Sequence, residues 1–132
     1  MRVHHKVTNA LEMALRAAGL PALVWHDVLI ELAHAPAHRL RPAELVGVLD
    51  MAQYNLSRLI DRMAQDGVVA RAPCDDKRGY WIVLTASGLK RQQDMYHVYA
   101  QVIMQEMGAH LDEDSARKLA RQLGKILPQP KG

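Results

Sequence analysis

The sequence predicts a mainly helical fold that carries one small antiparallel sheet, an α+β class. Three features of residues 41–85 predict it: two short helical segments joined by a tight turn, two β-prone segments after them, and a charged tip between those strands. A helix-turn-helix followed by a β-ribbon is the order of a winged helix-turn-helix module. The flanking segments are predicted to be helical, so we expect this module to be flanked by N- and C-terminal dimerisation helices.

A chain of 132 residues suits one domain with a core of its own. We assign residues 21–85 to the winged helix-turn-helix module. Residues 1–20 and 86–132 are assigned to a helical dimerisation region.

The N-terminal part predicts two helices. Apolar residues recur at helical spacing from about residue 3 to residue 18, and Gly19 suits the position after a helix end. Pro21 suits the first turn of a second helix that reaches about His34. Pro36 ends it, and residues 37–41 could supply one extra strand. The apolar stripe of the second helix comprises Trp25, Val28, Leu29 and Leu32.

The helix-turn-helix is expected over residues 42–65. Pro42 fits the first turn of a helix that ends at about Leu49, with residues 50–52 as the turn. The next helix is expected over residues 53–65, and Gly67 supplies a left-handed stop. The side chains expected to face inward are Leu45, Val48, Leu49, Leu56, Leu59, Ile60 and Met63.

The other face of the second of these helices is almost entirely polar. It presents Gln53, Tyr54, Asn55, Ser57, Arg58, Asp61 and Arg62. Gln and Asn can bind adenine edges in a major groove, while Ser and Arg can hold phosphates. The alternative is an ordinary solvated face, which is what most polar helix faces are.

Residues 68–71 and 80–84 predict a hairpin with a charged tip. Lys77 and Arg78 lie at the tip, and an arginine on such a ribbon can enter a narrow minor groove. The alternative is that Asp75 and Asp76 merely pair with these bases and shape the turn.

The C-terminal part is again helical by pattern, from residue 86 to about residue 110. Thr85 or Ser87 can cap this helix, and a last helix starts at Asp112 or Asp114. Apolar faces on terminal helices with no partner of their own predict an intersubunit bundle. A twofold homodimer would place two recognition helices about one DNA turn apart, as a palindromic site requires.

The positive charge is concentrated in the module. The formal net charge is +3. Residues 39–91 hold nine Lys or Arg against six Asp or Glu, whereas the rest of the chain holds eight of each. The excess therefore lies where contact with phosphates would need it.

Composition excludes several other classes. No apolar run is long enough for a membrane span, and the first residues lack the apolar segment of a secretory signal. The lone cysteine fits a reducing compartment, so we expect a cytoplasmic protein. No nucleophile with an adjacent base, and no pair of carboxylates suited to catalysis, is visible, so neither an enzyme nor a cofactor is predicted.

The chain resembles winged-helix transcription factors of the MarR (multiple antibiotic resistance regulator) family. The matching phrases are LPALVWHDVLIELAHAP, RPAELVGVLDMAQYNLSRLIDRMAQDGVVAR and DDKRGYWIVLTASG, so the resemblance covers nearly the whole chain. It implies a homodimer that binds palindromic double-stranded DNA. Such proteins usually act as repressors released by a small, often phenolic, ligand or by thiol oxidation.

The resemblance implies DNA contacts at specific positions. Lys77 and Arg78 match the last two residues of the wing's usual Asp-Arg-Arg, with lysine in place of the first arginine. Ala52 stands where a serine N-cap is common, so an anchoring hydroxyl is absent. The residues expected to contact DNA on or beside the recognition helix are Ala52, Gln53, Tyr54, Asn55, Ser57, Arg58 and Arg62.

The resemblance also implies an effector crevice beside the first, second and fifth helices. The candidates for an aromatic wall and a carboxylate-binding charge are Arg16, Trp25, His26, Tyr96 and Tyr99. The alternative is that the aromatic residues simply belong to the core.

Two other forms of sensing are disfavoured, and two rival functions stay open. Cys74 lies at the base of the wing beside Asp75 and Asp76, which do not activate a thiol. The seven histidines form no metal-binding pair within one helix. A protein-interaction module with an acidic partner, or an architectural DNA binder without an effector, would fit the same module.

Overall fold

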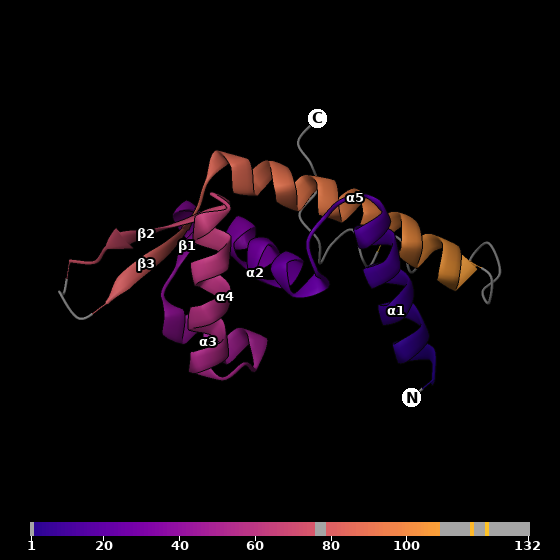
Figure 1. Ribbon diagram of the computed structural model, residues 1–132, viewed down its shortest axis with the longest axis horizontal. Coiled ribbons are helices and arrows are strands. Elements are labelled where there is room, and N and C mark those ends of the chain that lie inside the picture. The colour runs from indigo at the N-terminus through magenta and orange to yellow at the C-terminus, as the bar shows by residue number, and fades with distance from the viewer. Residues whose placement is uncertain (1, 76–78, 109–116, 118–120, 122–132) are drawn as a thin grey trace. The chain divides into compact units, whose positions relative to one another are not determined.

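The computed structural model describes residues 2–75, 79–108, 117 and 121. The elements, in chain order, are α1 (Arg2–Ala17), α2 (Leu23–His34), a 3-10 turn (Pro36–His38), β1 (Arg39–Leu40), α3 (Pro42–Leu49), α4 (Gln53–Gln65), β2 (Val69–Pro73), β3 (Tyr80–Leu84) and α5 (Ala86–Gly108) (Figure 1). The expected mainly helical fold with one small sheet and a winged-helix order is confirmed. The last helix expected after residue 112 lies outside the described residues.

The chain divides into two compact units. Residues 24–92 form one unit, and residues 1–23 together with 93–132 form the other. The first of these, called the winged unit below, contains α2 from Val24 onward, α3, α4, the sheet and the first residues of α5.

The sheet of the winged unit has three antiparallel strands in the order β1-β3-β2. The pairing of β2 with β3 runs from Val69 opposite Leu84 to Pro73 opposite Tyr80, and these strands project as a ribbon (Figure 1). The extra strand expected in residues 37–41 is present as β1, which pairs with β3.

The core of the winged unit joins the helices to one face of the sheet. Its fully buried side chains include Val28, Leu29, Leu32, Leu45, Leu56, Ile60, Met63, Val68 and Ile82. On α4 the buried residues recur every three or four positions, so the opposite face of that helix is left to solvent. Backbone turns fix its two ends: Asp50 has a φ of 50° in the turn before α4, and Gly67 has a φ of 80° after it.

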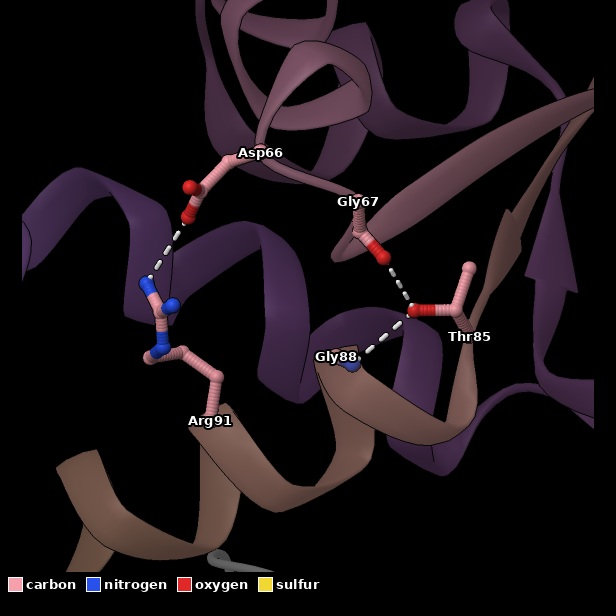
Figure 2. Close-up of polar contacts among 5 residues, drawn as sticks. All are labelled: Asp66, Gly67, Thr85, Gly88 and Arg91. Atoms are coloured by element: carbon pink, nitrogen blue, oxygen red, sulfur yellow. Dashed lines mark hydrogen bonds and ion pairs between the residues drawn. The ribbon is translucent and has the colours of Figure 1, made fainter.

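A polar junction ties the end of α4 to the start of α5 (Figure 2). The Thr85 hydroxyl donates to the Gly67 carbonyl oxygen over 2.6 Å and accepts from the Gly88 N–H over 2.9 Å. Arg91 donates to Asp66 over 3.0 Å. Of the two residues that the sequence offers as caps for α5, Thr85 therefore makes the capping bond.

Thr85→Val should lower the free energy of unfolding by about 1–2 kcal/mol, because it keeps the shape of the side chain and removes both hydroxyl bonds. Chemical denaturation followed by circular dichroism measures this change. Thr85→Ser should retain most of the stability, and Ser87→Ala, at an exposed neighbour, should cost little. A Thr85→Val protein as stable as wild type would contradict the capping role.

Two local expectations are wrong. Pro21 does not begin α2, which starts at Leu23 instead; there the backbone N–H of Leu23 donates to the Glu12 carboxylate over 3.0 Å. A side chain from α1 thus caps α2, which no local pattern indicates. Val48 is 56% exposed and does not face inward. Leu45 is the only fully buried residue of the short helix α3.

The other unit has a small core of its own between α1 and α5. Leu11, Val102 and Ile103 are buried, and Tyr99 is among the partly buried side chains packed against them. Gly19 has a φ of 72° after α1, as expected of a residue that ends a helix. Within the described residues, no helix combines the length and apolar character that a membrane span requires.

Candidate nucleic-acid interface

The solvent face of α4 carries the residues expected to meet DNA. Ala52 is the N-cap of α4, and its backbone is extended. It makes no side-chain capping bond, because alanine lacks the hydroxyl that a serine would supply at this position. The exposed residues of this surface, called the recognition face below, are Ala52, Gln53, Tyr54, Asn55, Ser57, Arg58 and Arg62.

The arginines of the recognition face lie beside polar and aromatic neighbours. Arg58 donates to the Tyr54 hydroxyl over 3.3 Å, and its guanidinium carbon lies 5.5 Å from the centre of the Tyr54 ring. Arg58 and Arg62 also line a depression of about 330 Å³ together with Asn55. The face thus combines amide groups that can read bases with cations that can hold phosphates.

The one acid that sequence analysis placed on this face is paired. Asp61 accepts from Arg71 of β2 over 2.5 Å, and both side chains are partly exposed. A hydrogen bond with Tyr80, followed in importance by the bond with Asp61, raises the pKa of Arg71. The pair joins α4 to the wing and offsets a negative charge that would repel phosphate.

The wing strands are described up to Asp75 and again from Gly79. The two basic residues expected at the tip, Lys77 and Arg78, lie outside the described residues. Cys74, at the base of the wing, is a half-buried free thiol.

The five residues expected to bind an effector come from three helices. Arg16 of α1 is exposed and lines a depression of about 100 Å³ with Glu12. His26 of α2 is 2% exposed, and this burial lowers its pKa to about 4. Trp25 is half-buried.

The two tyrosines of α5 have different neighbours. The Tyr96 ring meets His97 edge-on at 5.8 Å between centroids, whereas Tyr99 packs on the α1–α5 core. Over the part of the chain that the structure describes, no group of three or more His, Cys, Asp or Glu side chains is placed to hold a metal ion.

Sequence reasoning missed an arginine pair beside the sheet. The guanidinium carbons of Arg39 and Arg41 lie 4.3 and 5.0 Å from the centre of the Trp81 ring. The only signal in the sequence was the Arg-Leu-Arg spacing, which places two cations on one side of an extended chain. The tryptophan lies 40 residues further along, so only the fold brings the three together.

The helix-turn-helix, the ribbon and the polar recognition face together define a winged-helix module of the nucleic-acid-binding type. A family model described as "MarR family" matches residues 18–79. The multiple antibiotic resistance protein MarR of Escherichia coli K12 is 34% identical over 88 residues, which span 66% of this chain and 61% of that protein.

Solved structures extend the likeness over most of the chain. Wild-type MarR from E. coli in its apo form matches with a TM-score of 0.79 and 30% identity, over 96% of this chain and 93% of that one. A mutant of the same protein, complexed with operator DNA, matches with a TM-score of 0.75 and 29% identity, over 96% and 89%. The chain belongs to the MarR family, whose members are transcriptional regulators and not enzymes.

Proposed function

We propose that this protein is a sequence-specific DNA-binding regulator that acts as a repressor by binding a palindromic operator as a homodimer. The observation that carries the proposal is the exposed polar face of α4, set beside a ribbon and backed by a buried core. The complex of E. coli MarR with operator DNA shows a related winged-helix protein on DNA and supports the same role here.

Each part of the recognition face has a function in this proposal. Gln53 and Asn55, at the N-terminal end of α4, read base edges in the major groove, where amides bind adenine bidentately. Arg58 and Arg62 hold the phosphates that flank the groove. Lys77 and Arg78 reach the adjacent minor groove from the wing.

In the proposed homodimer, the second subunit supplies a second recognition helix. Two recognition helices related by a twofold axis fit two half-sites about 10 bp apart. Repression follows from occupancy of the operator, and release follows when an effector favours a spacing of the two helices that no longer fits both half-sites.

The proposed effector is a small aromatic acid, whose candidate contacts are Trp25 and His26 in the winged unit and Arg16, Tyr96 and Tyr99 in the other unit. A panel of hydroxybenzoic acids, titrated into the protein–DNA complex, should lower DNA affinity at concentrations that also raise the melting temperature of the free protein. If no acid of the panel changes the affinity for DNA, small aromatic acids are ruled out as effectors. The proposal that the protein binds DNA would still stand.

Selection from a random DNA pool tests the proposal. Purified protein should recover a pseudo-palindrome with half-site centres about 10 bp apart. Recovery of sequences without a motif would overturn the regulator proposal and favour a partner that is not DNA.

Asn55→Ala should relax the preference at one base pair of each half-site by about 1–3 kcal/mol, because a base contact is lost while phosphate contacts remain. Binding to operators altered at single positions measures this effect. Arg62→Ala is the matched control: it should weaken binding to every operator alike. Unchanged base preference in the Asn55 variant would contradict the assigned docking of α4.

A further inference from the structure

The arginine pair beside Trp81 has a position that the recognition face does not explain. In β3, Ile82 and Leu84 point into the core, so Trp81 and Val83 lie on the opposite face of the sheet. Arg39 pairs directly with Val83 across β1 and β3, which puts its side chain on that same face beside the indole.

Small side chains make room for this arrangement. On β2, the residues opposite Trp81 and Val83 are Ala72 and Ala70. The face of the sheet that turns away from the core therefore carries one half-buried indole, two exposed guanidinium groups and little else of comparable size over these strand residues.

Arg41 links this cluster to the recognition face. It lines a groove of about 290 Å³ whose other walls include Gln53, the first residue of α4, and Gly79 and Tyr80 at the start of β3. Its main-chain N–H donates to the Glu44 carboxylate over 3.0 Å, which fixes the backbone at the start of α3. Arg41 thus borders both the first residue of α4, the helix proposed to enter the major groove, and the start of the ribbon proposed to reach the minor groove.

We propose that Arg39 and Arg41 form a clamp on the DNA backbone phosphates between the two grooves, and that Trp81 positions both. This inference rests on the proposed function, since it names which residues hold the strand between helix and wing. Cation–π stacking engages the face of a guanidinium, so its N–H edge keeps the geometry that binds phosphate. A stacked arginine also loses less side-chain freedom on binding than one that extends into solvent.

The test measures the salt dependence of binding to a duplex selected by the wild-type protein. Arg39→Ala and Arg41→Ala should each reduce the slope of log K against log salt by about 0.9, the value for one phosphate contact. Base preference should not change. Lys90→Ala is the matched control: Lys90 lies next to Arg91, which binds Asp66 at the far end of α4, about 20 Å from Gln53 by helix length.

Trp81 is tested as a positioning residue by a double-mutant cycle. Trp81→Leu should lower affinity several-fold in the wild-type background but have no further effect when both arginines are alanine, and Trp81→Tyr should restore most of the loss. A purely structural role would lower affinity equally in both backgrounds. Circular dichroism and melting temperatures confirm that each variant is folded.

The outcomes separate the two proposals. If the wild-type protein discriminates its duplex from a shuffled one but the arginine variants keep its salt slope, the clamp is overturned and the regulator stands. The clamp is equally overturned if Lys90→Ala lowers the slope as much. If the wild-type protein binds no duplex preferentially, both proposals fall.

Discussion

Gly88→Ala is expected to destabilise the protein by about 3 kcal/mol or more, the upper range for overpacking a rigid site. A Cβ at this position would lie 1.9 Å from the Val68 carbonyl oxygen and 2.8 Å from a methyl carbon of Leu84. The first of these is backbone and cannot rotate away. Relief would require α5 to move from the strand it contacts, which would also break the bond from the Gly88 N–H to Thr85 (Figure 2).

Gly47→Ala provides the matched control. Gly47 lies in α3, and a Cβ added there would meet nothing within 4 Å, so the same chemical change should stabilise the protein by up to about 1 kcal/mol. Thermal and chemical unfolding of the two variants measures the contrast. Equal stabilities would show that the close approach of α5 to Val68 is not a constraint in solution.

Stability should also fall as the pH drops from about 6.5 to about 4 because of His26. The unfolded chain binds a proton at this residue near its ordinary pKa of 6.5, whereas burial lowers the folded pKa to about 4. Within that window the unfolded state holds more protons, so the free energy of unfolding decreases with falling pH. The loss begins below pH 6.5 and amounts to about 3 kcal/mol by pH 4.

The measurement is urea denaturation at several pH values for wild type and His26→Gln. The carboxylates titrate in both proteins, so the difference between their pH profiles isolates His26. A His26→Gln profile parallel to wild type would show that this imidazole does not remain neutral in the folded protein.

Local patterns predicted most of the winged unit because local chemistry determines it. The helical residues 42–49 and 53–65 were expected with the bounds that they have, since Pro42, the apolar spacing and Gly67 each act on their own neighbours. The hairpin and an extra strand before α3 were also expected, whereas the pairing of that strand with β3 was not.

The features that escaped prediction depend on contacts between distant residues. α2 begins at Leu23, where Glu12 of α1 accepts its N–H, and Val48 is exposed although Leu45, three residues earlier on the same helix, is buried. The cluster of Arg39, Arg41 and Trp81 likewise forms across strands that meet only in the folded chain. The exposed residues of α4 were predicted as one polar surface. The molecule that binds this surface is not determined by the chain alone, so DNA binding stays a proposal.

Whether the protein reads base sequence is decided by the ratio of its dissociation constants for the selected duplex and for a shuffled duplex of equal length and composition, at physiological salt. Sequence-specific regulation predicts a ratio of about 10³ or more in favour of the selected duplex. Equal affinity for both duplexes would show that the protein is not a sequence-specific regulator, because phosphate contact alone would then explain the binding.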